Sequence, residues 1–159
     1  MISIALAVAV TIHTAASIDV GVRSAPALSA ATEASSEKAN EMKIRLRVGA
    51  TSLTATLQGS KTSRDFASLL PLALTMKDLF RREKYGQLPR PLSGEGKRAH
   101  VYEVGQIAYW APGPDVAIYY RQDGEPIPDP GIIILGMIDT GVEAFDVPAA
   151  TEVTIERVK

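Results

Sequence analysis

The sequence predicts a mainly β protein, a closed β-barrel with one or two short helices, over residues 42–159. Apolar and polar residues alternate in several short runs, which is the pattern of half-buried strands. Turn-forming Gly, Pro and Asp residues separate these runs at even spacing, which favours a barrel. With 46% apolar and 22% charged residues among 159, the composition is that of one globular domain.

A β-hairpin is expected at the beginning of this domain. Lys43 to Val48 alternates between basic and aliphatic residues, and Thr51 to Gln58 alternates between polar and apolar residues. Gly49-Ala50 separates the two runs and fits a two-residue type II′ turn, in which Gly occupies the first position.

A short helix and a third strand should follow. Thr62 stands three residues before Asp65, close to the pattern of a capping box at a helix start. One face of the helix would then carry Phe66, Leu69 and Leu70. Pro71 marks the helix end, and Leu72 to Met76 alternates as a strand.

The segment from Leu79 to Gly96 is expected to be a long surface loop, because it holds several Pro and Gly residues. From Lys77 to Arg98 there are seven basic residues and three acidic ones. One interpretation is a basic patch for an anionic ligand or an acidic partner. The alternative is a solvated loop whose charges balance across the fold, and this is favoured because no nucleic-acid motif is present.

Further strands are expected in the C-terminal half. They are Val101–Val104, Ile107–Trp110, Val116–Tyr120, Ile132–Ile138 and Thr151–Val158. Gly136 interrupts the most apolar of these runs, and Val142 to Phe145 is compatible with one helical turn.

The residues before Met42 divide into a leader, 1–23, and a linker rich in Ala, Ser and Glu, 24–41. The apolar run ISIALAVAVTI, residues 2–12, is too short to span a bilayer and fits a signal peptide. No Lys or Arg follows Met1, however, and MKIRLRV from Met42 also looks like a natural start.

Three origins of this segment therefore stay open: a signal peptide, a retained anchor, or a misassigned start. The protein is exported or periplasmic if the leader is genuine, with only transient membrane contact through the leader. It is cytoplasmic if Met42 is the true start.

The composition excludes several kinds of chemistry. Cysteine is absent, which removes thiol nucleophiles, zinc–thiolate sites and iron–sulfur clusters. His13 lies in the leader and His100 stands alone, so no metal-ligand spacing is present. No cofactor, metal or catalytic residue is predicted, and a net charge of −1 predicts no nucleic-acid partner.

The aromatic residues of two neighbouring strand runs form adjacent pairs, Tyr109-Trp110 and Tyr119-Tyr120. Within each pair the side chains should point to opposite faces of the sheet. Half of them should therefore line the interior and half the outside, which suits a binding cleft as well as ordinary core packing.

Three motifs resemble the bacterial cyclophilin-like domain family, in the order that the family has them. The first is SRDFASLLPL at 63–72 followed by Glu83-Lys84 and Leu88-Pro89; the others are GQIAYWAPGPDVAIYY at 105–120 and IIILGMIDTGVEAF at 132–145. The resemblance implies a closed barrel of about eight strands with few helices. This chain has Gln106 where the family usually has Asp.

Fold likeness does not imply activity. Prolyl isomerases of the cyclophilin type carry an F-H-R motif and a Q-G-G-D motif, and neither occurs here. The first hypothesis is therefore a non-catalytic barrel that holds a small molecule or an extended peptide at its mouth. The candidate ligand-binding residues are Arg64 and Glu83 for charge, with Tyr109, Trp110 and Tyr120 for the apolar wall.

Two alternatives remain. One is a peptidyl-prolyl cis–trans isomerase with an atypical site, since isomerisation needs a shaped pocket and a donor to the twisted amide. The other is an interaction module that presents Lys77 to Arg98 to an acidic partner, with salt-sensitive binding.

Overall fold

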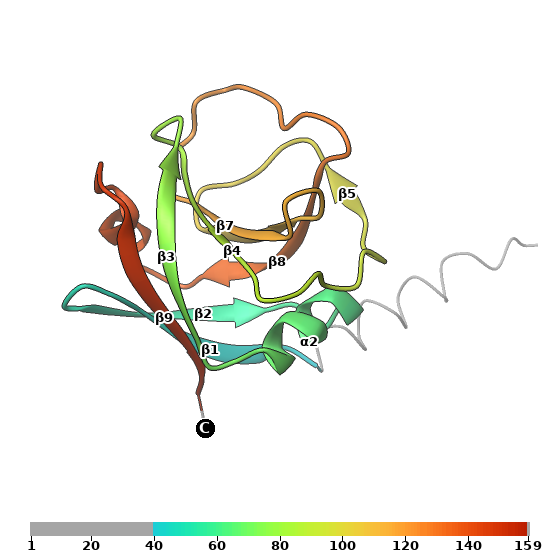
Figure 1. Cartoon of the computed structure of the whole chain (residues 1–159), viewed down its shortest axis with the longest axis horizontal. Coiled ribbons are helices and arrows are strands. Elements are labelled where there is room, and N and C mark those ends of the chain that lie inside the picture. The colour runs from blue at the N-terminus through green and yellow to red at the C-terminus, as the bar shows by residue number, and fades with distance from the viewer. Residues whose placement is uncertain (1–39, 159) are drawn as a thin grey trace, which may run out of the picture.

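The computed structural model describes residues 40–158, which form one antiparallel sheet closed into a barrel (Figure 1). The strands are β1 (Met42–Val48), β2 (Thr51–Leu57), β3 (Leu72–Leu79), β4 (Glu83–Gln87), β5 (Arg98–Ala99), β6 (Gln106–Trp110), β7 (Asp115–Tyr119), β8 (Ile132–Ile138) and β9 (Thr151–Arg157). The helices are α2 (Lys61–Ser68) and the 3₁₀ turn η1 (Val142–Phe145).

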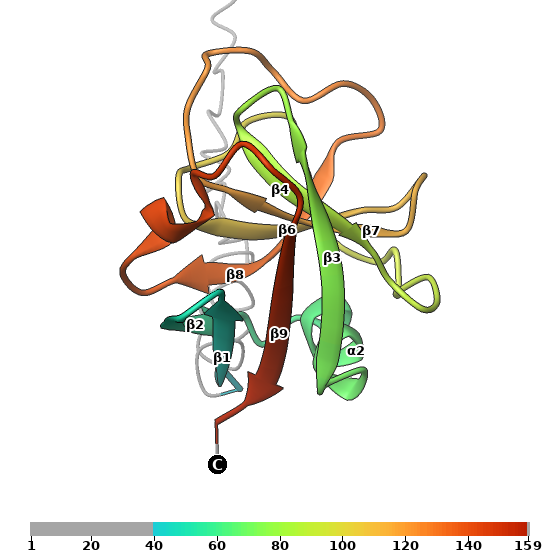
Figure 2. The ribbon, with the colours of Figure 1, turned by 60° about the vertical axis from the view of Figure 1, so that its left-hand side comes forward.

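Eight strands make the barrel wall, in the order β2-β1-β9-β3-β4-β7-β6-β8, and β2 pairs with β8 to close it. The short strand β5 pairs with the first residues of β8, Ile132 and Ile133. Figure 2 shows β3 and β9 running side by side, in agreement with their antiparallel register. The predicted closed, mainly β barrel is confirmed. The predicted leader and most of the predicted linker lie outside the described residues.

The first hairpin forms as predicted. Val48 pairs with Thr51 across the two-residue turn Gly49-Ala50. Gly49 has φ of +57° whereas Ala50 is not in the left-handed region, which is the pattern of a type II′ turn.

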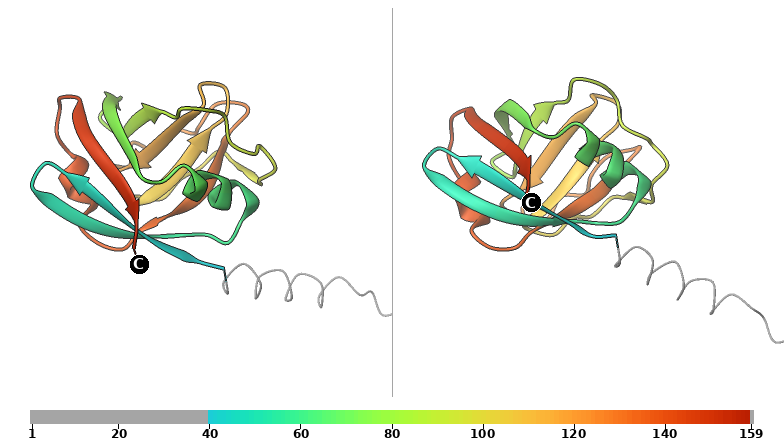
Figure 3. Two further views of the ribbon diagram at one scale, coloured as in Figure 1. Left: turned by 60° about the horizontal axis from the view of Figure 1, so that its bottom comes forward. Right: turned by 90° about the horizontal axis from the view of Figure 1, so that it is seen from below.

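Side chains of alternate residues fill the barrel interior, as the strand periodicity requires. Fully buried members of this core include Ile44, Leu46, Leu57, Met76, Ile107, Ile118 and Leu135. Helix α2 lies across one end of the barrel, where Phe66 enters the core (Figure 3). Among residues 40–158, no helix is long and apolar enough to cross a bilayer.

The opposite end of the barrel is closed by a buried charge. The ammonium group of Lys84 donates to Oδ2 of Asp78 at 3.0 Å and to the carbonyls of Val147 and Ala149, at 2.9 Å for Ala149. Lys84 is fully buried. The hydroxyl of Tyr120 donates to the same Asp78 oxygen. Lys84 therefore ties the segment before β9 to the barrel wall.

The closing seam between β2 and β8 explains why a glycine interrupts the most apolar strand. Gly136 pairs with Leu57, and a Cβ at Gly136 would lie 2.3 Å from the carbonyl oxygen of Thr56. That separation is far below any real contact, so the seam requires a residue without a side chain.

The structure differs from the predicted elements in three places. The segment Leu79–Gly96 is not all loop, because it contains β4. The sequence of β4 does not alternate between apolar and polar residues, because two charged residues, Glu83 and Lys84, are both buried, on opposite faces of the strand. Val101–Val104 forms no strand, and Val101 is exposed. The N-cap of α2 is Ser60, whose hydroxyl accepts the Ser63 amide hydrogen, rather than a residue at Thr62.

Three of the seven basic residues of the 77–98 segment form ion pairs within the fold. Arg82 pairs with Glu83, Lys84 with Asp78, and Arg90 with Asp65. These three charges are balanced within the fold.

Candidate functional site

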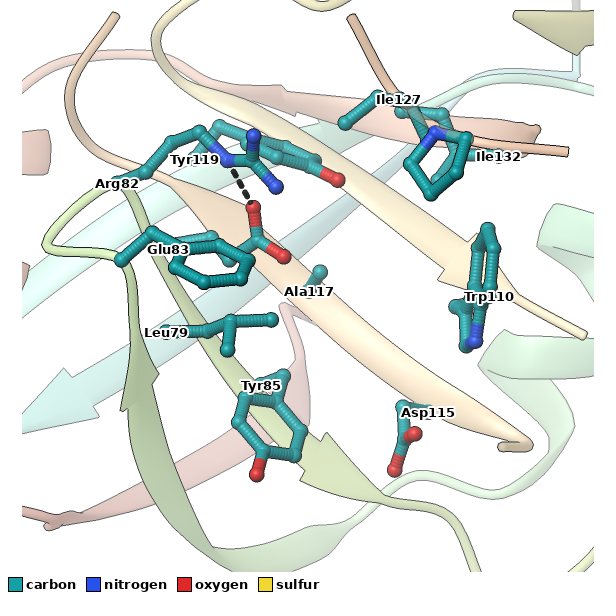
Figure 4. Close-up of a pocket in the computed structure, with 12 residues that line it drawn as sticks. Leu79, Arg82, Glu83, Tyr85, Trp110, Asp115, Ala117, Tyr119, Ile127 and Ile132 are labelled. Carbon is teal, nitrogen blue, oxygen red and sulfur yellow. Dashed lines mark hydrogen bonds and ion pairs between the residues drawn. The ribbon is translucent and has the colours of Figure 1, made fainter. Parts of the chain in front are cut away.

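A pocket of about 290 Å³ lies on the outer face of the barrel wall, over β4, β7, β6 and β8 (Figure 4). Its aromatic and apolar lining comes from Phe80, Tyr85, Trp110 and Tyr119, with Leu79, Ala117, Ile127, Pro128 and Ile132. Its charged lining is Arg82, Glu83 and Asp115. The pocket is therefore apolar overall, with a few polar groups, which is the usual build of a small-ligand site.

The strand alternation decides which aromatic residues reach this pocket. Tyr109 and Tyr120 point into the barrel core, where the Tyr109 hydroxyl accepts the Leu92 amide hydrogen at 3.1 Å. Trp110 and Tyr119 point outward and line the pocket. Each adjacent pair thus splits between the two faces, as the sequence pattern indicates.

A buried ion pair stands at one end of the pocket. Nε of Arg82 donates to Oε2 of Glu83 at 2.6 Å, and both side chains are only 7% exposed. Nη1 of Arg82 donates to Oδ2 of Asp123 at 3.3 Å. The Tyr102 hydroxyl donates to the other oxygen of Asp123 at 3.0 Å, while its ring stacks on Tyr119 with centroids 4.2 Å apart. The guanidinium is held in place by two carboxylates and an aromatic stack.

The loop between β7 and β8 forms one wall of the pocket. Ile127 donates its amide hydrogen to the His100 carbonyl at 2.8 Å, and Nδ1 of His100 lies 2.9 Å from the Ile127 carbonyl oxygen. These contacts hold Ile127 and Pro128 over the outer face of the barrel.

Burial controls the electrostatics of this site. Desolvation raises the pKa of Glu83 above its usual range, although the hydrogen bond from Arg82 opposes the rise. Burial also raises the pKa of Asp115, and the charge of Lys77 opposes this rise. The pKa of Tyr119 is raised as well, by burial and by the nearby Glu83 carboxylate.

Two polar side chains among the lining residues can offer hydrogen bonds to a ligand, the Glu83 carboxylate through Oε1 and Tyr119 through its hydroxyl. In Figure 4 this Glu83 oxygen points toward Ala117 and the middle of the pocket. A largely apolar pocket that offers a few polar groups of this kind is suited to a ligand that carries polar groups of its own.

The turn between β3 and β4 forms the pocket rim. Phe80 and Arg81 have φ of +55° and +53°, and the Arg82 amide donates to the Leu79 carbonyl at 3.1 Å. Two successive left-handed residues without glycine are strained. Phe80 is also 73% exposed and stacks over the Arg82 guanidinium, 5.4 Å from ring centre to Cζ. Backbone strain of this kind is often found at binding and active sites.

The structure brings two of the five candidate residues together. Glu83 and Trp110 line the pocket, whereas Tyr109 and Tyr120 lie in the core on the other side of the wall. Arg64 lies on α2 and donates to the Gly59 carbonyl.

Sequence reasoning missed Arg82, Tyr85, Asp115 and Tyr119 as lining residues. The alternation of the aromatic pairs was the available signal for Tyr119. It does not say which member of a pair faces out.

The described residues hold no cluster of three or more His, Cys, Asp or Glu side chains arranged for a metal ion.

The fold and the pocket define a closed antiparallel β-barrel with a ligand-sized site on its outer face. Residues 46–156 match the model of the Cyclophilin-like family, and the chain belongs to this family. Among solved structures it is similar to a hypothetical protein from Archaeoglobus fulgidus, at 23% identity and a TM-score of 0.62. That match covers 75% of this chain and 96% of the other, and it shows the shared fold. No curated protein matches the chain.

Proposed function

We propose that this protein binds a small molecule, or one or two side chains of an extended peptide, in the outer-face pocket without transforming it. The observation that carries the proposal is the buried Glu83 carboxylate. One of its oxygens is held by Arg82, and the other faces an aromatic pocket of about 290 Å³.

Energetics support a ligand at this place. Hydrogen bonds to a charged group contribute about 1.5–3 kcal/mol, more than those between neutral groups. A ligand that donates to the Glu83 carboxylate would gain a contact of this kind in a pocket that is otherwise mainly apolar. The pocket volume lies at the lower end of the range for ligand sites, so the ligand, or the part of it that enters, is small.

The outer-face pocket replaces the barrel mouth considered from the sequence. One barrel end is covered by α2 with Phe66 in the core, and the other is closed by Lys84 and the segment it holds. The pocket lies outside the wall, between β4, β7 and the loop that carries Ile127.

The test uses the single tryptophan of the chain, which lines the pocket. A library of metabolites and short peptides is screened by Trp110 fluorescence and by melting temperature. Ligands that bind should shift both. Ala117→Leu fills the pocket floor and should abolish the shifts, whereas Ala73→Leu, at an exposed position on β3, should leave them intact. A screen in which no compound perturbs Trp110 would overturn the proposal.

A second candidate is a peptidyl-prolyl isomerase with an atypical site. The observation in its favour is a guanidinium, Arg82, beside an aromatic-walled pocket. It is the weaker candidate because Nε and Nη1 of Arg82 are already bound to Glu83 and Asp123. A protease-coupled assay on an X-Pro peptide separates the two: an unchanged isomerisation rate at micromolar protein excludes the enzyme.

We also propose that the protein is exported, because residues 2–12 are apolar and are followed by small residues. Intact mass spectrometry of the mature protein tests this. Loss of roughly the first two dozen residues supports export. A mass that corresponds to a chain beginning at Met42 supports an internal start.

A further inference from the structure

We infer that the outer-face pocket selects a small organic cation, an amidinium, guanidinium or ammonium group on a flat apolar body, with the cationic group on Oε1 of Glu83. This inference rests on the proposed function, because it names the class of ligand for the same pocket.

The balance of charge around the pocket is the first argument. The charged lining residues are two carboxylates, Glu83 and Asp115, and one guanidinium, Arg82. The lining itself therefore carries a negative surplus, which disfavours an anion inside the pocket and favours a cation.

The state of Arg82 strengthens this argument. Among the lining residues it is the only cation, and its Nε and Nη1 donate to two different carboxylates. Its positive charge is therefore shared between Glu83 and Asp123. An anion could still reach the remaining N–H groups of Arg82, but it would meet a guanidinium whose charge two carboxylates already offset, with Glu83 beside it.

The position of Glu83 is the second argument. Its side chain is 7% exposed, one oxygen is bound by Arg82, and the other faces the pocket. Burial raises the pKa of this carboxyl, which means that one guanidinium does not fully compensate its charge. A second donor with positive charge would complete the compensation and form a charge-assisted hydrogen bond.

The walls supply the third argument. Trp110, Tyr85 and Phe80 bring aromatic rings to the pocket, and Ala117 leaves room at its floor. Aromatic faces attract cations, by about 0.5–2 kcal/mol as the site becomes desolvated. The same rings pack against a flat apolar body, so both halves of the ligand are matched.

Three fragments of nearly equal shape test the inference on the intact protein: benzamidine, benzamide and benzoate. Binding is followed by the indole resonance of Trp110 in NMR spectra and by Trp110 fluorescence. Benzamidine should bind about tenfold or more tightly than benzamide, because a charge-assisted contact replaces a neutral one. Benzoate should bind more weakly than benzamide.

Glu83→Gln removes the charge and keeps the size of the side chain. It should weaken benzamidine binding about tenfold, while benzamide changes by less than about twofold. Glu95→Gln is the matched control, because Glu95 is exposed and pairs with Lys61 away from the pocket. The wild-type comparison of the three fragments does not depend on how the Glu83 variant folds.

The outcomes separate this inference from the proposed function. If benzamide or benzoate binds at Trp110 as tightly as benzamidine, the pocket is a ligand site but the inference of a cationic ligand is wrong. If no fragment of the trio and no compound of the wider screen perturbs Trp110, the proposed function itself fails. A benzamidine preference that Glu83→Gln leaves unchanged would also contradict the inference, since the cation would then sit elsewhere.

Discussion

Glu83 and Lys84 are neighbours in the chain and are buried on opposite faces of the same strand. Glu83 faces the outer pocket and pairs with Arg82, while Lys84 faces the barrel end and pairs with Asp78. Both lie in β4, at 6% and 0% exposure. Glu83 thus belongs to the candidate site, whereas Lys84 stabilises the fold.

Lys84→Met should destabilise the protein. The change leaves Asp78 and the carbonyls of Val147 and Ala149 without their shared donor. Removing one partner of a buried ion pair costs about 3 kcal/mol or more. Urea unfolding monitored by circular dichroism measures this loss. Lys97→Met, at an exposed position, should stay within about 0.5 kcal/mol of the parent, and equal effects of the two variants would contradict the role given to Lys84.

Gly136→Ala should weaken the barrel seam. The new methyl group would collide with the Thr56 carbonyl oxygen and with Cα of Leu57, both of which belong to the backbone of β2. Overpacking of this kind costs about 1–3 kcal/mol, and more where backbone must move. Thermal unfolding gives the loss, and amide exchange along β2 and β8 should rise. Gly94→Ala has only a flexible Arg98 side chain nearby and should be tolerated.

The strained turn at the pocket rim should accept a stabilising double change. Phe80→Asn with Arg81→Gly supplies residues that tolerate positive φ at both positions, the preference of a type I′ turn. A gain of about 1 kcal/mol is expected. The matched variant Phe80→Ala removes the ring but keeps the strain, so it should not gain stability.

Ligand binding should separate the two roles of this turn. Both variants lose the aromatic ring at the rim, so both should bind benzamidine more weakly by a similar factor. A double variant that is no more stable than the parent would show that the turn stores no strain.

Asp65 should make part of the stability depend on pH. Its hydrogen bond from Arg90, at 2.6 Å, holds the pKa of this carboxyl below its usual value; burial opposes this, and the Ser93 amide, at 2.7 Å, adds to it. A lowered folded-state pKa contributes stability that is present above the pKa of an unfolded aspartate. That contribution is lost as pH falls through the lower, folded pKa.

The measurement is an NMR titration of carboxyl carbons, together with amide exchange at Ser93. Exchange at Ser93 should accelerate as Asp65 takes up its proton, because the contact between α2 and the segment around Ser93 is then weakened. In the Asp65→Asn variant, the acceleration of Ser93 amide exchange at low pH should disappear. An Asp65 that titrates at or above the usual aspartate pKa would contradict the expectation.

Part of the candidate site could be predicted from the sequence. The adjacent pairs Tyr109-Trp110 and Tyr119-Tyr120 show that one ring of each pair faces the outside, because strand side chains alternate. The pattern gives no absolute direction, so it could not place Tyr119 in the pocket and Tyr120 in the core. That choice depends on which face of β7 meets the other strands.

Arg64 and Arg82 show that the sequence also could not tell which charged residue lies in the pocket. Both precede an acidic residue in the sequence, and nothing local separates them. Arg82 becomes the pocket cation because Asp123 and Tyr102 come to it from 41 and 20 residues further along the chain. Contacts between residues so far apart are set by the closed sheet and leave no pattern in a short window of sequence.

The sequence by itself determined the mainly β class, the first hairpin and the family, because alternation, turn residues and motifs are local properties of the chain. The tertiary structure alone decided where the pocket lies. Barrel closure at Gly136 fixes which face of each strand is inside, and the loop that carries Ile127 then covers the outer face beside Glu83. Burial of two consecutive charges in β4 is likewise a consequence of packing on both faces, since no strand pattern predicts it.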